Sequence, residues 1–342
     1  MDSISPADQN QDALVAADHA PLTSPEGWRP SRLHAFGRDW PETNCDLDYW
    51  IELVASRGLA PEAMLGFIAA QDFIVDQFSL LVPAKDDLER FYGVTIRPLA
   101  LYGRFEDHFA AHVRSGGVVV IETDSFYLPD SRGVAYRRRH IQSAIAIAAI
   151  DPARRRADYF HNLGFWRLEG DDYDMTVHRP LHLQADEIIP PHAEVIRFER
   201  EPLGEAALRA AALERLAWRL SRRPAGDPVA AFAATFPAQL ERLAGAGENA
   251  FHDWAFHNLR QLGAGFELFG DHLGWLDGGP RFRAARDACK QVSSLAKTLQ
   301  FQVARAVLGG RTPKTAGLLE QIGAARQAAL AGAEAGAANA TR

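Results

Sequence analysis

The sequence has few cysteines, no long apolar run and no excess of positive charge. Two cysteines in 342 residues exclude a disulfide framework, and with the twelve histidines they form no zinc-binding pattern, so reduced thiols are expected. The longest apolar runs, near residues 117–121 and 144–150, are too short to span a bilayer. A net charge of -7 argues against a nucleic-acid-binding protein, which would need a basic face.

What is present is the composition of an ordinary globular protein. Hydrophobic residues make up 47% and charged residues 24% of the chain, and the mean hydropathy is -0.19. The length allows two domains, each with its own core. The first residues carry several aspartates and no basic segment that leads into an apolar one, so we expect no secretion signal. The sequence therefore predicts a cytoplasmic protein without a membrane or nucleic-acid partner.

Residue content divides the chain into four parts. Residues 1–30 are polar and contain four prolines, which predicts a flexible arm. Residues 31–202 mix short helical patterns with β-like runs, whereas residues 203–330 are rich in Ala, Leu, Arg and Glu at helical spacing. Residues 331–342 are an Ala/Gly-rich stretch that predicts a disordered tail. The expected class is α+β, with a mixed N-terminal domain followed by an all-α helical domain.

Individual elements follow from periodicity and turn residues. Strands are expected at residues 118–123, 143–150 and 157–161, the last two paired as a hairpin. Helices are expected at residues 46–54, 84–92, 104–115, 203–220, 228–243, 249–275 and 281–307.

Cys45 is the most informative single residue. Apolar residues follow it at the spacing i, i+3, i+4 and i+7, which predicts an amphipathic helix that starts at about Cys45 and ends before Gly58. The free N–H groups and the positive dipole end of a helix N-terminus favour a nucleophilic thiolate. A lone cysteine also fits a small buried hydrophobe. Cys289 is predicted to be such a buried structural thiol, because it lies at helical spacing with Val292 and Ala296.

A cysteine nucleophile needs a base and a group that orients the base. His140 precedes an expected strand, and in the expected hairpin Asn162 returns to the same end of the sheet, where its side chain would accept the imidazole N–H. His161 competes with Asn162, since neighbours along a strand point to opposite faces and only one of them can face His140. Asp151 is a second choice. The plainer interpretations are a polar strand end for His140 and turn formers for Asn162 and Asp151.

Several motifs resemble a known family. They are Trp40-Pro41-Glu42-Thr43-Asn44-Cys45, Glu122 to Asp130, Tyr136 to His140 and Tyr159-Phe160-His161-Asn162, together with Arg260 to Ala264 and Ala296 to Phe301. Over roughly residues 35–310 the chain resembles the bacterial domain of unknown function 1839 family. More remotely, the order of these motifs is similar to butirosin-type acyltransferases and to the leader-cleaving cysteine peptidases of bacteriocin exporters, which are papain-like. The resemblance implies a papain-like N-terminal domain with Cys45 as nucleophile, His140 as base and Asn162 as orienting group.

The oxyanion donor departs from that pattern. Peptidases of this type carry a glutamine several residues before the cysteine, and the corresponding segment here has none. The backbone N–H of Cys45 with the side chain of Asn44 or Gln77 is the alternative, although Asn44 also fits a helix N-cap. Asp46 and Asp48 would raise the pKa of the thiol and oppose the helix dipole.

The sequence also suggests substrate contacts. Two acids and a tyrosine of one motif, Asp124, Tyr127 and Asp130, are candidate substrate-binding residues, although acids on loops are more often solvated turn residues. The basic triplet of Arg137, Arg138 and Arg139 would suit the phosphate of a phosphopantetheine arm or the acidic face of an acyl carrier protein, or it is a solvated turn.

The resulting prediction is an acyltransferase with a Cys-His-Asn triad. It would move an acyl or aminoacyl group from a carrier-protein thioester to a small-molecule amine or alcohol acceptor through an acyl-cysteine intermediate. No metal or cofactor is expected, apart from phosphopantetheine that arrives on the donor, and His252, His257 and His272 are too widely spaced for a helix-borne metal site. The alternatives are a cysteine peptidase or thioester hydrolase, and a non-catalytic binding protein on a papain-like shell.

Overall fold

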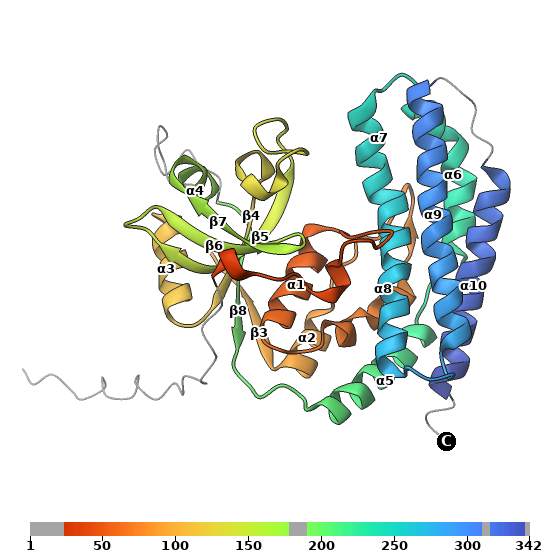
Figure 1. Ribbon diagram of the computed structural model, residues 1–342, viewed down its shortest axis with the longest axis horizontal. Helices are drawn as coiled ribbons and strands as arrows, with labels where there is room; N and C mark the ends of the chain where they lie inside the picture. Colours follow the sequence, from red (N-terminus) through yellow and green to blue (C-terminus); the bar gives the residue numbers. More distant parts are fainter. Residues whose placement is uncertain (1–23, 178–189, 310–314, 339–342) are drawn as a thin grey trace, which may run out of the picture.

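The computed structural model describes residues 24–177, 190–309 and 315–338 (Figure 1). Its N-terminal part is built around a β-sheet and its C-terminal part is helical, as the sequence predicted. Figure 1 shows the long C-terminal helices standing side by side, with α1 (Cys45–Ser56) between them and the sheet.

Six antiparallel strands form the main sheet. Their order across the sheet is β3 (Val94–Pro98), β8 (Ala193–Phe198), β4 (Val118–Asp124), β5 (Gln142–Asp151), β6 (Arg156–His161) and β7 (Gly164–Glu169). The three predicted strands are confirmed as β4, β5 and β6, and β5 and β6 pair as the expected hairpin. Strands β3, β7 and β8 were not predicted. A separate short hairpin pairs β1 (Phe73–Ile74) with β2 (Gln77–Phe78).

Both faces of the sheet are covered because apolar side chains alternate along its central strands. Ala144 and Ala146 of β5 face the core that contains α1, whereas Ile145 and Ile147 face a second cluster. The second cluster is covered by α3 (Phe105–Arg114) and α4 (Gly170–Thr176). The remaining helical segments of this half are η1 (Pro25–Gly27), η2 (Arg32–His34), η3 (Pro61–Ala70), α2 (Lys85–Tyr92), η4 (Ser125–Tyr127) and η5 (Pro129–Ser131).

The C-terminal half confirms the four predicted helices and adds two features. Its elements are α5 (Glu205–Ser221), α6 (Pro228–Leu243), α7 (Glu248–Ala255), η7 (Phe256–Arg260), α8 (Gln261–Leu276), α9 (Arg283–Gly309) and α10 (Ala316–Ala338). The predicted helix at 249–275 is a continuous run in which η7 is a π-helical turn. Helix α10 continues to Ala338, through most of the stretch for which the sequence predicted a tail. The first part of the predicted arm, residues 1–23, lies outside the described residues.

One apolar core joins the two halves. Leu47 and Ile51 of α1 belong to the same cluster of buried side chains as Phe266 and Phe269 of α8, and all four are fully buried. Segment η3 packs against both α5 and α8. Helix α1 therefore belongs to the core that both halves share.

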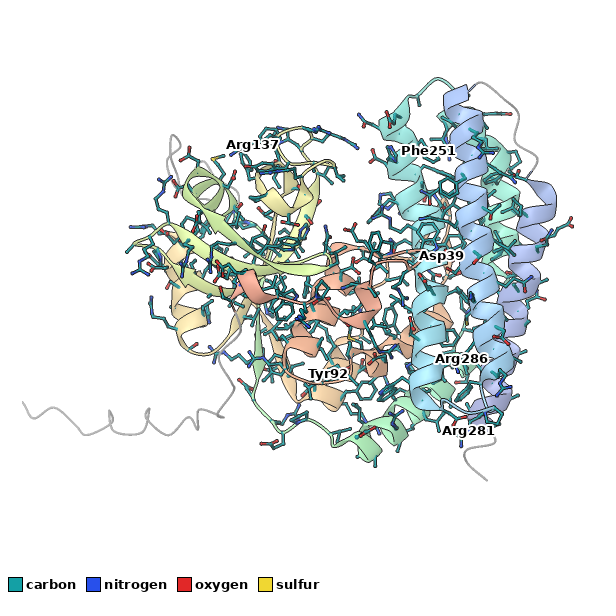
Figure 2. The ribbon with its side chains drawn as sticks, viewed as in Figure 1. Asp39, Tyr92, Arg137, Phe251, Arg281 and Arg286 are labelled. Carbon is teal, nitrogen blue, oxygen red and sulfur yellow. The ribbon has the colours of Figure 1, made fainter. Side chains whose placement is uncertain are left out.

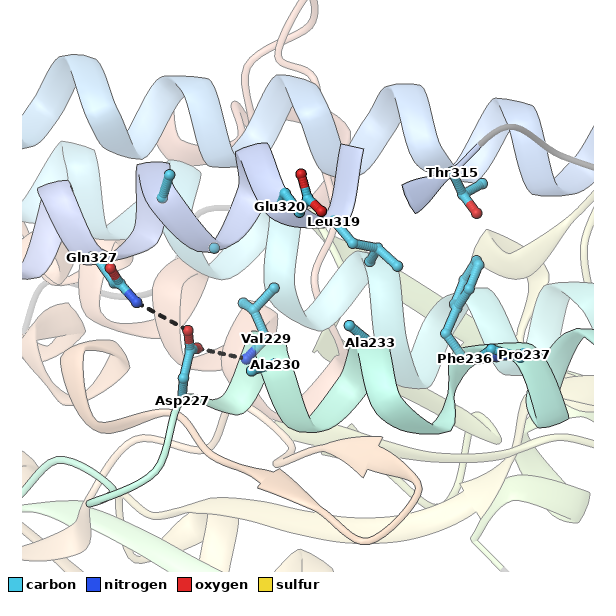
Figure 3. A pocket seen from close by; sticks show the side chains of 12 residues that line it. Asp227, Val229, Ala230, Ala233, Phe236, Pro237, Thr315, Leu319, Glu320 and Gln327 are labelled. Atoms are coloured by element: carbon cyan, nitrogen blue, oxygen red, sulfur yellow. Dashed lines mark hydrogen bonds between the residues drawn. The ribbon is translucent and has the colours of Figure 1, made fainter. Parts of the chain in front are cut away.

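The helical half also contains a groove of about 620 Å³ between α6 and α10 (Figure 3). Small and apolar side chains line it, and Asp227 at one end accepts hydrogen bonds from the Val229 N–H at 2.9 Å and from Gln327 at 3.1 Å. None of the predicted site residues lines this groove. No helix within the described ranges is long and apolar enough to cross a membrane.

Candidate functional site

Helix α1 begins with Cys45, and Asn44 is its N-cap. The Asn44 carboxamide oxygen accepts the Leu47 N–H at 3.1 Å, which satisfies one of the free donors of the first turn. Its amide nitrogen donates to the Leu81 carbonyl at 3.0 Å and to Gln261 Oε1 at 3.2 Å. Both N–H groups of this buried amide are thus in use, so Asn44 has no donor left for a reacting oxygen.

The Cys45 thiol is partly buried against the start of β5. Burial and then the carboxylate of Asp46 raise its pKa to about 11, while hydrogen bonding to the Ser143 hydroxyl and to the Ala144 backbone lowers it. At neutral pH the group is a thiol. A chemical role for Cys45 therefore requires a neighbouring base that removes the proton as the sulfur attacks.

A chain of buried hydrogen bonds leads from that neighbourhood to a carboxylate. Ser143 Oγ lies 2.7 Å from His161 Nε2, and His161 Nδ1 lies 2.6 Å from Asp130 Oδ2. The exposed fractions are 7% for Ser143 and 2% for His161. Tyr159 donates its hydroxyl to the other oxygen of Asp130 at 2.5 Å. Asp130 thus fixes the imidazole, and Ser143 connects the imidazole to Cys45.

The protonation of His161 follows from these partners. Burial lowers its pKa, but the charge and hydrogen bond of Asp130, together with the charges of Glu42 and Asp48, outweigh burial, so that the pKa is raised above the ordinary value. With the Nδ1–H donated to Asp130, a neutral ring accepts the Ser143 hydroxyl at Nε2, and a protonated ring donates to it. With the ring neutral, the chain Cys45–Ser143–His161–Asp130 can carry a proton away from the thiol.

Other titratable groups with shifted pKa values lie on the segment that precedes Cys45. Burial and the nearby Asp48 raise the pKa of Glu42, which lies close enough to Arg260 and His161 to be influenced by both. Two carboxylates surround His34, which is also buried. Such a concentration of perturbed groups is typical of functional sites.

His140, the predicted base, lies in a different environment. Its side chain is 69% exposed, its Nδ1 is 2.5 Å from Asp124 Oδ2, and its ring stacks on Phe126 with centroids 4.4 Å apart. The described contacts of His140 do not include Cys45 or Asn162. Asp124 is thus the carboxylate that orients His140, and it also accepts the N–H groups of Phe126 and Ile141.

Asn162 and Asp151 are both turn residues in the structure. Asn162 has a φ of 46° in the short turn between β6 and β7, a left-handed conformation that asparagine tolerates. Continuing the β5–β6 register places it opposite Ala144, which at the usual rise per residue is about 13 Å along the strand from His140. Asp151 ends β5 and accepts the Arg154 N–H at 3.1 Å.

The remaining predicted residues are distributed around the site. The side chain of Asp130 is only 1% exposed and accepts hydrogen bonds from His161 and Tyr159, so Asp130 orients His161 and is not open to a substrate. Tyr127, the last residue of η4, lies beside His140. Gln77 is exposed on the β1–β2 hairpin. In the basic triplet, Arg137 pairs with Asp172, Arg139 pairs with Asp253 of α7 at 3.1 Å, and exposed Arg138 donates to the Gly133 carbonyl at 3.1 Å.

Sequence reasoning missed two contributors, Ser143 and Gln261. Ser143 lies in a strand and carries no local sequence signal, because its role depends on its contacts with His161 and Cys45. Gln261 follows the π-turn and is fully buried, with its side chain bonded to Asn44, the Leu81 N–H and the Phe256 carbonyl. For His161 the sequence offered one signal, the alternation of side chains along the strand, which places His161 and Asn162 on opposite faces of the sheet.

Together the fold and the site define a two-part α+β protein with a cysteine at a helix N-terminus and a serine, a histidine and an aspartate linked behind it. Residues 29–198 match the family described as the DUF1839 N-terminal domain, and residues 205–334 match the DUF1839 C-terminal domain. The chain belongs to the DUF1839 family. A comparison with curated proteins gave no match.

Proposed function

We propose that this protein is a cysteine-dependent acyltransferase. It takes an acyl or aminoacyl group from a carrier-protein thioester and passes it through Cys45 to an amine or alcohol acceptor. The observation that carries the proposal is the hydrogen-bonded chain from the Cys45 neighbourhood through Ser143 and His161 to buried Asp130. It supplies the base and the orienting group that a thiol with a raised pKa requires.

The proposed reaction has two steps. In the first step the Cys45 sulfur attacks the donor carbonyl and forms a C–S bond, while the donor's own C–S bond breaks. The thiol proton moves to Ser143 as Ser143 gives its hydroxyl proton to His161, and His161 then returns a proton to the leaving thiolate. In the second step the acceptor nitrogen or oxygen attacks the acyl-cysteine, its proton returns by the same route, and Cys45 is regenerated.

The backbone of α1 supports this chemistry. Among the described residues, no acceptor takes the N–H groups of Cys45 and Asp46, which open the first turn of the helix. These two donors and the helix dipole suit an oxyanion that forms on the carbonyl under attack. We assign them the oxyanion role in place of the Asn44 side chain.

We also propose that the N-terminal half is papain-like. In support, a helix that begins with the nucleophile packs against an antiparallel sheet, and the histidine and its partner serine come from adjacent strands of that sheet. The resemblance of the Cys45 and Asp124–Asp130 motifs to papain-like acyltransferases agrees with this interpretation.

The proposed docking site for a carrier protein centres on Arg138. Of the basic triplet it alone pairs with no described carboxylate, whereas Arg137 and Arg139 are engaged by Asp172 and Asp253. An exposed cation beside two engaged ones suits a transient contact with an acidic surface.

A non-catalytic binding protein is the second candidate. The observation that favours it is the pKa of Cys45, which burial and Asp46 raise to about 11, because most catalytic cysteines have a lowered pKa. In that case the surface around Cys45 binds a ligand without forming a covalent bond.

The test is the formation of an acyl-enzyme. The protein is incubated with an acyl thioester of N-acetylcysteamine, and the adduct is detected by intact mass spectrometry and located by peptide mapping. We expect acylation at Cys45 and none at Cys289, which is fully buried. Cys45→Ser should lose the adduct, and His161→Gln should slow its formation by at least about a hundredfold, the usual contribution of a general base. The matched variant His140→Gln should retain most of the rate.

Other outcomes assign other functions. Loss of acylation in His140→Gln with a normal rate in His161→Gln would move the base to the His140–Asp124 pair. No adduct on a folded wild-type protein would contradict the enzyme and favour the binding protein. Release of free acid without an acceptor would indicate a hydrolase, and accelerated release with added amine indicates a transferase.

A further inference from the structure

The π-turn η7 places a cation beside the segment that leads to Cys45. Arg260 is the last residue of this turn, and its Nη1 lies 3.8 Å from Glu42 Oε2, with the guanidinium 5.4 Å from the centre of the Phe256 ring. The next residue, Gln261, is bonded to Asn44, the residue before Cys45. Since π-turns in helices are often found at functional sites, this placement indicates a role in the site.

A second cation comes from α9. Lys297 lies with Nζ 4.0 Å from the centre of the Trp40 ring, and it forms no ion pair with any carboxylate in the described part of the chain. Burial and then the nearby charge of Arg260 lower the pKa of Lys297. Trp40 is fixed in a notch of α8, because a Cβ on Gly263 would lie 2.5 Å from its indole ring.

The acids near these cations accept hydrogen bonds from other groups. Glu267 accepts the N–H groups of Asp39 and Trp40 at 3.2 and 3.0 Å, and Asp39 accepts the Ser294 hydroxyl at 3.0 Å. Figure 2 labels Asp39 where this segment meets the helical half. Among the described carboxylates, only Glu42 lies within ion-pair distance of Arg260, and their separation of 3.8 Å is longer than a hydrogen bond. Arg260 thus has one loose ion pair and Lys297 has none among the described residues, although the charges of Asp39 and Glu267 still act on Lys297.

We propose that Arg260 and Lys297 bind an anionic group, a carboxylate or a phosphate, of the substrate that Cys45 acts on. This inference rests on the proposed function of Cys45 and adds a substrate class to it. Trp40 provides a rigid wall for Lys297, and the guanidinium of Arg260 supplies the planar donors that suit such anions.

The first experiment measures the local field without any catalysis. Cys45 is alkylated with iodoacetate and with neutral iodoacetamide at pH 9 and low ionic strength, and the ratio of the two rate constants is determined by peptide mass spectrometry. Any change in thiol pKa affects both reagents equally, so the ratio reports attraction of the carboxylate. We expect the ratio to fall about threefold in Arg260→Gln or Lys297→Gln and about tenfold in the double variant.

Lys290→Gln is the matched control, because Lys290 is an exposed lysine on the same helix. An unchanged ratio in the double variant, or an equal fall in Lys290→Gln, would overturn the proposal. If the variants fail to fold, a second experiment on the wild type alone still tests the proposal. Inorganic phosphate at constant ionic strength should slow iodoacetate more than iodoacetamide, and equal slowing counts against an anion site.

Three thioester substrates identify the source of the anion. If the site binds a carboxylate on the acyl group, the succinyl thioester of N-acetylcysteamine acylates Cys45 faster than the butyryl thioester, and the preference disappears in Arg260→Gln. If it binds the phosphate of the donor arm, the two thioesters behave alike and only a phosphopantetheine thioester is slowed by the substitution. Absence of acylation with a normal alkylation ratio would reject the proposed enzyme and leave the anion site standing.

Discussion

His34 is buried between two carboxylates that are themselves buried. Its Nδ1 lies 2.6 Å from Glu52 and its Nε2 3.3 Å from Asp48, and its side chain is 2% exposed. Glu52 also accepts the Ser31 N–H at 2.9 Å and the Trp28 indole N–H at 3.0 Å. This network ties the segment before Cys45 to the middle of α1, so its protonation affects the position of the thiol's helix.

The stability of the protein should decrease as pH rises from about 6.5 to 9. Burial alone lowers the pKa of His34, but hydrogen bonds to Asp48 and Glu52 raise it to about 9. A raised pKa stabilises the folded state below 6.5, and this contribution, about 3 kcal/mol, is lost as pH rises through 9. Urea unfolding at several pH values measures it.

His34→Gln provides the comparison. The variant should be less stable than the wild type at pH 6, and the difference should shrink toward pH 9. A difference that stays constant across this range would show that His34 is not protonated in the folded state. His272, whose pKa burial lowers to about 4, acts in the opposite direction, since its contribution is lost as pH falls below 6.5.

Among the site residues, the sequence identified the cysteine and its N-cap better than the histidine and its carboxylate. Asn44 and Cys45 carry local signals, because an N-cap and the first residue of an amphipathic helix are defined by their immediate neighbours. The pairing of His161 with Asp130 joins residues 31 apart through a loop whose path no local pattern describes. Alternation showed that His161 and Asn162 point to opposite faces, but not which face Cys45 approaches.

Among the elements, α8 depends on a glycine at its contact with the segment before α1. A Cβ on Gly263 would lie 2.5 Å from the Trp40 indole, a distance that the rigid ring cannot accommodate without moving. Gly317 near the start of α10 has no atom of the described residues outside its own helix backbone within 4 Å of the same position. The two glycines therefore differ in packing while both lie in helices.

Gly263→Ala should destabilise the protein by about 1–3 kcal/mol, the usual cost of overpacking. Gly317→Ala should be neutral or stabilising by up to about 1 kcal/mol, because alanine favours helix. Chemical denaturation of both variants and the wild type gives the two differences. Equal effects in the two variants would mean that Trp40 does not occupy the notch in α8.

The elements that the sequence missed have physical reasons in common. Strands β4 and β5 contain long apolar runs and were predicted, whereas Arg97 and Pro98 in β3 and Glu194 and Arg197 in β8 interrupt the apolar residues of those strands. The π-turn inserts a single residue into a helical run, which periodicity over a window of this length does not resolve.

At the scale of the whole molecule, the two halves share one core. The buried cluster extends from Leu33 in the N-terminal half to Ala337 at the end of α10. Because the halves bury apolar surface against each other, this larger core is complete only when both are folded, whereas the second cluster lies within the N-terminal half. The molecule should therefore unfold as one unit although its sequence has the appearance of two domains.

Differential scanning calorimetry checks this expectation. We predict a single transition whose calorimetric enthalpy equals the van 't Hoff enthalpy, since all of the shared core must separate at once. Gly263→Ala, which acts at the contact between the halves, should shift the whole transition to lower temperature. Two resolved transitions, with only one of them shifted by the substitution, would show that the halves are independent.

The bond between Asn44 and Gln261 has a consequence for biosynthesis. Gln261 is translated 217 residues after Asn44, which at 5–20 residues per second corresponds to roughly 10–40 s. During that interval the N-cap amide of the nascent chain lacks its partner, and the π-turn with Arg260 does not yet exist. The reactive centre is thus completed only after the whole N-terminal half and the helices α5 to α7 have been translated.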